Sequence, residues 1–420
     1  MRDTCRGRIW VRAATVPGVV LLQACADQRT GATDYQLGDT LVVESMRPVI
    51  ADTLELREVD RIGQFDGPPE YLFTNVYAFA AGFDGSLFVH DNDDGIRQFD
   101  PEGRYVRHLA GPGQGPREVG YLLGMDVDSA GHLAAVDLAN ARVSIFDVDG
   151  DDVTVFPRPN LRARYGDGSI RFDSDGTLWI GVHPATPSSG GIPHPRLAFL
   201  QYSVEGDLLD SLTTPSNASA VCTTLSEGEY RMGFWEDRRE PFLPKTTWAI
   251  GPDGSFAIGC PEDYVLDVHQ PDADIVRIHR SWDPLLMTDE ARERMRRQSG
   301  LNPPPRRRPA YARIILPGDG RVWVWPNQPM EQIELSQEDA AAFGRTYAMR
   351  ISTRGAFDVF TEEGRWLATV KMPDEAPFSG FPTEPSVLIR GDTIWALATD
   401  ELDVQYVVRY EVPGLDGMSK

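Results

Sequence analysis

The sequence contains few of the residues that build metal centres and nucleophilic active sites. Only 4 cysteines and 7 histidines occur among its 420 residues. There is no Cys-x-x-Cys pair and no Gly-x-Ser-x-Gly motif, and the histidines are not spaced as metal ligands are. These absences exclude a cysteine-based zinc module and a nucleophile elbow. No apolar run reaches the length of about 20 residues that a membrane-spanning helix needs.

Positive charge is also scarce. The chain has 41 Lys and Arg against 63 Asp and Glu, which gives a formal net charge of −22. This excess argues against nucleic acid as a partner, because its phosphates would be repelled, and it suits a soluble protein outside the cytoplasm. One basic cluster, Arg306–Arg308, follows three prolines. It is either a solvated loop or a contact for an acidic partner.

Turn residues, by contrast, are abundant, with 39 Gly and 32 Pro. A short sequence motif recurs six times along the chain. It consists of a tight turn with glycine followed by a strand of apolar, β-branched or aromatic residues. Its copies begin at Phe83, Ser129, Ser174, Pro252, Gly318 and Ile389. Six copies predict an all-β fold, a six-bladed β-propeller with four-stranded blades.

A second hairpin follows the first in each unit and supports this period. The turn glycines Gly85, Gly131 and Gly176 are 46 and 45 residues apart, which is close to the length of one blade. Later spacings are longer, so those blades carry insertions. The alternative is a β-sandwich in which the Asp-Gly turns recur by coincidence. A β-sandwich would not require two hairpins that repeat with the same period.

The stretch from His108 to Asp147 resembles an NHL repeat. It has a Gly-Pro-Gly-rich connector, an inner strand, a glycine turn, an apolar strand that ends in Asp137 and a strand that ends in Phe146-Asp147. The whole chain resembles the bacterial six-bladed propellers of the NHL and TolB-like group, most clearly over residues 58–180. The resemblance implies the fold and leaves the activity open, because propellers have many unrelated functions.

The two ends of the chain are expected to meet in one blade. The last unit offers three strands, and Thr53–Gly63 aligns with the outermost strand of the first full unit. This N-terminal strand would therefore close the last blade and leave no open seam. We expect the propeller to occupy residues 53–414, with insertions at 213–240, 281–309 and 326–355 and a tail at 415–420.

Residues 1–24 have the pattern of a signal peptide, with four arginines before a short apolar core. The sequence Leu22-Gln23-Ala24-Cys25 resembles a bacterial lipobox, which implies lipid attachment at Cys25 and a linker over residues 25–52. We therefore expect a protein of the cell envelope, on the periplasmic or outer surface, that contacts the membrane only through its lipid. A secreted protein that is simply cleaved is the alternative.

Two further cysteines would share this oxidising compartment. With Cys5 removed and Cys25 acylated, Cys222 and Cys260 are the remaining thiols, and they form a candidate disulfide. Such a bridge would stabilise the fold by roughly 3–4 kcal/mol. Two separate buried thiols are the alternative.

Two weaker patterns bear on catalysis. His90 and His183 both follow second strands, where a zinc site like that of the NHL-type amidating lyases would draw its ligands. Asp91, Asp137 and Asn140 match the acidic and Asn ligands of lactonases that resemble gluconolactonase. The NHL pattern instead explains these three as hydrogen-bonding residues at strand ends and turns. We assign no catalytic, cofactor-binding or metal-binding residue.

The insertions point to a binding face. In a propeller blade the turns between the first and second strands and between the third and fourth strands share one face. All long segments of this chain fall on the other face, and helices are expected near 288–295 and 336–343. These segments carry the aromatic and Arg types that are common in hot spots. The candidate partner-binding residues are Trp235, Arg306, Arg307, Arg308, Tyr311 and Trp325.

The function expected from these patterns is a lipid-anchored, extracytoplasmic binding or scaffold module. Its partner would be a protein or a small-molecule ligand. The alternative is a hydrolase or lyase with a divalent metal in the central channel, and a third possibility is a purely structural component of an assembly.

Overall fold

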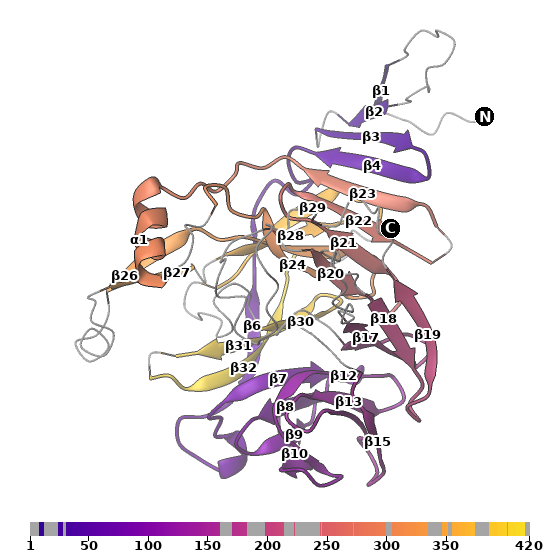
Figure 1. Cartoon of the computed structure of the whole chain (residues 1–420), viewed down its shortest axis with the longest axis vertical. Helices are drawn as coiled ribbons and strands as arrows, with labels where there is room; N and C mark the ends of the chain where they lie inside the picture. The colour runs from indigo at the N-terminus through magenta and orange to yellow at the C-terminus, as the bar shows by residue number, and fades with distance from the viewer. Residues whose placement is uncertain are drawn as a thin grey trace, which may run out of the picture.

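The computed structural model covers the whole chain. It describes residues 8–11, 24–27, 31–159, 170–182, 198–213, 222, 244, 246–271, 273–299, 305–334, 347–351, 355–373, 386–400 and 402–415. Strands dominate, and they form six blades arranged in a ring (Figure 1). The predicted six-bladed β-propeller is confirmed.

The first three blades follow the repeat of the sequence. Each contains four antiparallel strands in chain order. Blade one has β7 (Val76–Ala81), β8 (Leu87–Asp91), β9 (Gly95–Phe99) and β10 (Tyr105–Pro112), and the short β11 (Glu118–Val119) adds a parallel pairing with β10. Blade two has β12 (Leu122–Val127), β13 (His132–Asp137), β14 (Arg142–Asp147) and β15 (Val153–Pro157). Blade three has β16 (Ile170–Phe172), β17 (Leu178–Val182), β18 (Ala198–Tyr202) and β19 (Leu208–Thr213).

The last three blades keep this order and add strands from the N-terminus. Blade four has β20 (Thr247–Ile250), β21 (Phe256–Gly259), β22 (Val265–His269) and β23 (Ile275–Arg280). Blade five has β24 (Tyr311–Ile315), β25 (Val322–Pro326), β28 (Ala356–Phe360) and β29 (Trp366–Lys371). Blade six has β30 (Val387–Arg390), β31 (Thr393–Thr399) and β32 (Gln405–Glu411), completed by β6 (Arg57–Ile62).

Ring closure occurs in blade six, as expected. Strand β6 pairs antiparallel with β32, and the register places Ile62 opposite Val407. Ile62 is buried in a cluster with Phe73 and Phe99 of blade one. The N-terminal strand therefore both completes blade six and packs against the neighbouring blade.

The segment before β6 differs from the linker that the sequence suggested. Strands β3 (Ala32–Leu37) and β4 (Thr40–Ser45) form a hairpin, and β4 lies parallel to the outer edge of β23. The backbone N–H of Val49 then donates to Trp366 O, and β5 (Leu54–Glu55) pairs with β29. Residues 32–62, called the N-terminal strap below, thus run along the outer edges of blades four, five and six.

The strap is ordered because it buries apolar side chains. Val42 and Val43 are 3% and 2% exposed, and Val43 belongs to the core cluster of blades four and five. Two more strands, β1 (Arg8–Val11) and β2 (Ala24–Asp27), extend the same sheet beyond β3.

The core lies between the blades. Each blade is covered on both sides by its neighbours, so its middle strands are buried on both faces, and every residue of β8 and β9 is buried. Large aromatic rings fill the layers between the sheets. For example, Trp323 and Phe357 pack edge to face with their ring centroids 5.7 Å apart. Burial of this kind contributes roughly 25 cal/mol per Å² of apolar surface.

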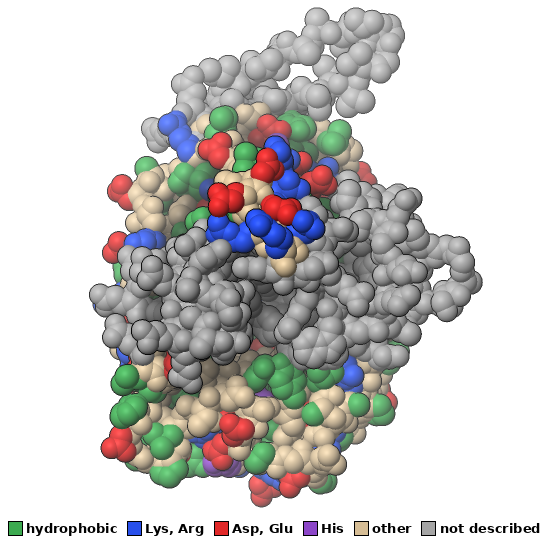
Figure 2. All heavy atoms as spheres, turned by 60° about the vertical axis from the view of Figure 1, so that its left-hand side comes forward, with side chains coloured by type: hydrophobic (Ala, Val, Ile, Leu, Met, Phe, Trp, Pro, Cys, Tyr) green, Lys and Arg blue, Asp and Glu red, His purple; other side chains and the backbone are tan. Residues whose placement is uncertain are grey.

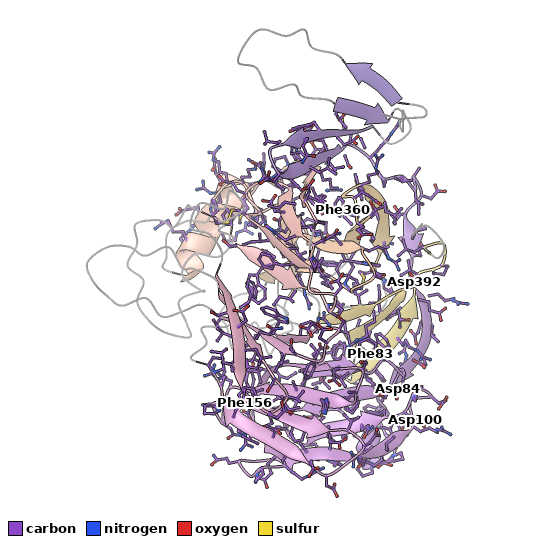
Figure 3. All side chains as sticks on the ribbon, turned by 90° about the vertical axis from the view of Figure 1, so that its right-hand side faces the viewer. Phe83, Asp84, Asp100, Phe156, Phe360 and Asp392 are labelled. Atoms are coloured by element: carbon purple, nitrogen blue, oxygen red, sulfur yellow. A yellow bond between two sulfur atoms is a disulfide. The ribbon has the colours of Figure 1, made fainter. Side chains whose placement is uncertain are left out.

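Short glycine turns define one face of the ring. At the repeated turn after each inner strand, glycine takes a positive φ, 89° at Gly85 and 87° at Gly131, which side chains disfavour. These turns and those after each third strand lie on one face, which we call the short-turn face. Figure 3 labels Phe83, Asp84 and Asp100 of blade one and Asp392 of blade six on it.

The opposite, insertion-bearing face carries the long connections. Helix α1 (Asp289–Ser299) lies between blades four and five, and the hairpin of β26 (Met330–Glu334) and β27 (Tyr347–Ile351) interrupts blade five. Both project on the left of the ring in Figure 1. Thr288 caps α1 by accepting from the N–H of Ala291 at 3.1 Å, which confirms the first predicted helix. The second, near 336–343, lies outside the described residues.

Candidate functional site

The strand-end acids of blade one and blade two serve the backbone. Asp91 accepts hydrogen bonds from the backbone N–H of Thr74 at 2.8 Å and from that of Asp93 at 3.1 Å. It also accepts a hydrogen bond from the guanidinium group of Arg97 at 3.1 Å. Both oxygens of this carboxylate are therefore used to hold the turn after β8 and the chain that leads into β7.

Asp137 has the same role in blade two. It accepts from the N–H of Gly120 at 2.8 Å and from the amide Nδ2 of Asn140 at 2.7 Å. These bonds match the structural interpretation of Asp91, Asp137 and Asn140. In the described ranges no group of three or more His, Cys, Asp or Glu side chains could hold a metal ion.

His90 is a core residue. Its ring is fully buried, and Nε2 lies 3.0 Å from the carbonyl oxygen of Gly120. Burial lowers the pKa of His90 from 6.5 to about 4, against the opposing effect of the Gly120 bond and of Asp91. The neutral ring thus joins blade one to blade two. His183, its expected counterpart, lies outside the described residues.

Three of the candidate partner-binding residues are buried, which corrects the expectation that they form a surface. Arg308 is 2% exposed, Tyr311 1% and Trp325 3%. Tyr311 donates its hydroxyl to Val265 O at 2.8 Å, and Arg308 donates to Gln328 O. They join blades four and five because the chain enters β24 through the core at this point.

Arg306 and Arg307 do lie on the surface, next to α1. Arg306 pairs with Asp289 at 2.8 Å, and Arg307 pairs with Asp263 at 2.5 Å. The guanidinium of Arg307 also covers the ring of Trp282, 5.1 Å from its centroid. Trp235 lies outside the described residues.

The surface around α1 mixes both signs of charge. Within the helix, Arg294 pairs with Glu290 at 2.7 Å, and Arg296 and Arg297 both approach Glu293. In Figure 2, which turns this side of the molecule forward, basic and acidic side chains are interleaved in the upper part of the coloured surface. Such exposed ion pairs contribute little to the stability of the fold. Because little free energy is lost when they separate, a charged partner can compete for these side chains.

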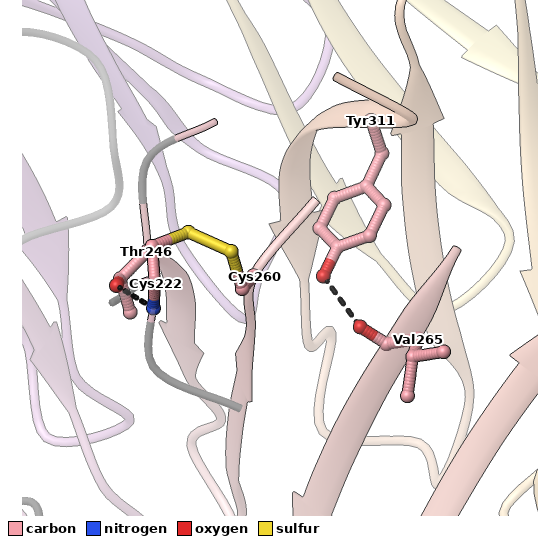
Figure 4. Close-up of a disulfide and its surroundings, with 5 residues drawn as sticks. All are labelled: Cys222, Thr246, Cys260, Val265 and Tyr311. Carbon is pink, nitrogen blue, oxygen red and sulfur yellow. Dashed lines mark hydrogen bonds between the residues drawn. A yellow bond between two sulfur atoms is a disulfide. The ribbon is translucent and has the colours of Figure 1, made fainter. Parts of the chain in front are cut away.

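The two cysteines considered above are joined. Cys222 and Cys260 form a disulfide with Cα atoms 4.9 Å apart, and the N–H of Cys222 donates to Thr246 Oγ1 at 3.0 Å (Figure 4). The bridge ties the connection before blade four to the end of β21. Cys25 lies in β2, in register with Trp10 and Asp34.

A buried polar cluster links blades four and five. The hydroxyl of Tyr264 donates to Asp358 Oδ2 at 2.7 Å, and Arg280 lies 3.4 Å from the same oxygen while covering the ring of Trp366. Burial raises the pKa of Asp358, and Arg280 opposes that rise. Each member is held by the others, so the cluster fastens the two blades.

A second charged cluster lies at the short-turn end of the inner strands, and sequence reasoning missed it. Oδ1 of Asp126 in β12 accepts hydrogen bonds from two arginines. These are Arg171 of β16, at 3.4 Å, and Arg390 of β30, at 3.1 Å. The three residues come from blades two, three and six. The sequence does contain a sign of this cluster. Asp126 and Arg171 occupy the same position in consecutive repeats, two residues before the turn aspartate, and the inner strands around them are largely apolar.

Comparison with known proteins identifies the fold and nothing narrower. No family model and no curated protein match the chain. A member of the DUF4221 family from Bacteroides vulgatus has 10% identity and a TM-score of 0.51, covering 86% of this chain and 98% of its own. A candidate exported protein from Bacteroides fragilis has 13% identity, a TM-score of 0.45, and coverage of 89% and 99%.

An enzyme is also among the similar structures. Virginiamycin B lyase from Staphylococcus aureus, in an inactive form with quinupristin, has 11% identity and a TM-score of 0.39, covering 83% of this chain and 98% of its own. At these identities the likeness concerns the fold alone. Within the described residues, no helix is both long and apolar enough to span a membrane.

Proposed function

We propose that this chain is an NHL-type propeller that is exported, anchored by a lipid on Cys25 and used as a binding or scaffold module. The partner, a protein or a small-molecule ligand, is captured on the insertion-bearing face. The observation that carries the proposal is the placement of α1 and the β26–β27 hairpin on one side of a ring that closes without them. Long ordered excursions from a compact fold are commonly functional.

Export is supported by two features. The leader has a basic start, an apolar core and a lipobox-like end before Cys25. The bridge between Cys222 and Cys260 belongs to an oxidising compartment.

The test of this proposal compares two charge reversals on opposite faces. Arg306→Glu alters the insertion-bearing face, where the Arg306 side chain is 68% exposed and its pair with Asp289 is a surface pair. Glu102→Lys is the matched control on the short-turn face, where Glu102 is 66% exposed and pairs with Arg104. Both variants should keep the wild-type melting temperature, because exposed pairs contribute at most about 1 kcal/mol.

The measurement is quantitative recovery of cross-linked partners from the native envelope, with the anchored wild type as reference. Arg306→Glu should reduce recovery of specific partners about tenfold, and Glu102→Lys should leave it unchanged. The reverse result would place the partner on the short-turn face. A stoichiometric divalent cation in the purified protein would favour the metal-dependent hydrolase or lyase instead.

A further inference from the structure

At the short-turn end of the ring, two arginines from distant blades share one carboxylate. Arg390 Nη2 lies 3.1 Å from Asp126 Oδ1, and Arg171 Nη1 lies 3.4 Å from the same oxygen. The other oxygen of Asp126 is taken by the N–H of Phe172 at 2.8 Å. Both oxygens of the carboxylate are thus engaged, and the two guanidinium groups share one of them.

These arginines have donors in excess. A guanidinium has five N–H donors. The bonds seen for Arg390 are those of Nη2 to Asp126 and to Val127 O, and its Nε is buried without a hydrogen-bond partner among the described residues. Among the described residues, Arg171 donates one hydrogen bond, to Asp126 at 3.4 Å.

Another buried arginine, Arg97, has more partners, although its Nε also lacks a hydrogen bond among the described residues. Arg97 donates to the carbonyl oxygens of Glu70 and Leu72 and pairs with both Asp91 and Asp94. Arg97 thus interacts with these four residues. Among the described residues Arg390 donates to two groups and Arg171 to one, although each of these side chains is only 13% exposed.

The charges at this place do not balance. Two cations face one anion, in a chain whose net charge is −22. Burial lowers the pKa of Arg390; Asp126 opposes that shift, and Arg171 adds to it. An additional anion would relieve this repulsion between the two arginines.

The neighbouring turn aspartates are already engaged and leave the excess charge in place. Asp392 lies 2.6 Å from Arg321, and Asp84 accepts from both the N–H and the hydroxyl of Ser86. Asp173 accepts from Thr177 and Trp179. These carboxylates hold their own turns or their own cation.

An exposed aromatic ring completes the place. Phe83, in the first turn of blade one, is 61% exposed, and the guanidinium carbon of Arg390 lies 4.3 Å from its ring centroid. Phe83 is labelled in Figure 3 close to Asp392 of blade six. Exposed apolar surface therefore adjoins the guanidinium group of Arg390.

We propose that Arg171, Arg390 and Phe83 form a binding site for a small organic carboxylate that carries an apolar group. The carboxylate accepts from N–H groups of the two guanidiniums that have no partner among the described residues, and the apolar group lies on Phe83. Planar bidentate recognition of carboxylates is the geometry that arginine favours. This site is on the face opposite to the proposed partner surface and is independent of it.

The experiment measures ligand binding by calorimetry on the mature protein at constant ionic strength. The probes are benzoate, acetate, inorganic phosphate and benzyl alcohol, which has the ring of benzoate without its charge. We expect saturable binding of benzoate, at least tenfold weaker binding of acetate, and no binding of benzyl alcohol. Phosphate should bind more weakly than benzoate because it gains nothing from Phe83.

Variants then locate the site. Arg390→Gln and Arg171→Gln should each weaken benzoate binding at least tenfold, since each removes charge-assisted hydrogen bonds. Phe83→Ala should bring the affinity for benzoate down to that for acetate. Arg104→Gln is the control, because Arg104 is an exposed arginine of the same face that pairs with Asp100, and it should bind as the wild type does.

Several results would overturn the proposal. No saturable binding of benzoate by the wild type would make the cluster a structural clasp between blades. Unchanged benzoate affinity in Arg171→Gln and Phe83→Ala, both measured on protein shown to be folded, would do the same even if Arg390→Gln failed to fold. Phosphate binding more tightly than benzoate would refute the carboxylate class.

Discussion

A buried neutral histidine makes the stability of this protein depend on pH. The ring of His90 is fully buried, and burial lowers its pKa to about 4. In the unfolded chain the group titrates near 6.5. Below that pH the unfolded state therefore binds a proton that the folded state does not accept.

We predict that the free energy of unfolding falls as the pH is lowered from 6.5 to 4, with His90 contributing a loss of roughly 3 kcal/mol over that range. Above pH 6.5 both states are neutral at this position, so the contribution is constant. His90→Gln keeps a donor for Gly120 O and should show a shallower pH dependence. The measurement is denaturant unfolding at a series of pH values.

Val89→Ala is the control, because Val89 is a fully buried, non-titrating residue of the same strand. It should lower the free energy of unfolding by the same amount at every pH and leave the pH dependence as in the wild type. Equal slopes for His90→Gln and the wild type would show that another group carries the acid sensitivity.

At the scale of single residues, the sequence predicted the hydrogen-bonding roles of side chains better than it predicted whether they lie on the surface or in the core. The strand-end aspartates Asp91 and Asp137 were expected to bond to turns, and they do. Tyr311, Trp325 and Arg308 were expected on a surface because their types are common at interfaces, yet the same types also fill cores. Only the path of the chain into β24 distinguishes the two uses.

At the scale of elements, β6 decides whether the ring closes. Ile62 is 7% exposed and packs between blade six and blade one, whereas Val59 on the same strand is 41% exposed. We predict that Ile62→Ala lowers the free energy of unfolding by about 2–5 kcal/mol. Val59→Ala, the matched control, should change it by about 0.5 kcal/mol or less. Equal losses in denaturant melts would show that β6 is not held by its buried side.

The elements that the sequence predicted are those with a local signature. The glycine turns and alternating strands of blades one and two repeat at a nearly constant spacing, so they could be read directly. The outer pairings of β4 with β23 and of β5 with β29 could not, because parallel edge pairs across hundreds of residues leave no period in the sequence. The residues of the Arg171–Asp126–Arg390 cluster left a local signal, but their contacts join different blades and so depend on the closed ring.

At the scale of the whole molecule, the position of Cys25 beside the strap places the proposed anchor at the rim of the ring. We predict that Cys25→Ser moves the protein from the membrane fraction to the soluble fraction, because no other part of the chain is expected to hold it there. Fractionation of cells followed by immunoblotting measures this. Cys5→Ser, within the leader, is the control and should leave the protein in the membrane fraction.

Mass spectrometry of the mature protein provides a second readout. An acylated Cys25 at the N-terminus is expected. An unmodified N-terminus elsewhere would contradict the anchor while leaving the fold and the carboxylate site untouched.

The N-terminal strap also sets an order in time. Residues 32–62 are synthesised first, but their partners β23, β29 and β32 end at residues 280, 371 and 411. The partners of the strap therefore become available in the order β23, β29 and β32. Strand β6 must wait for β32 until nearly all of these residues have been made, and contacts of such sequence separation form slowly. A chain interrupted before Gln405 would lack β32 and would keep an open ring with β6 unpaired, so closure of the ring depends on residues 405–411.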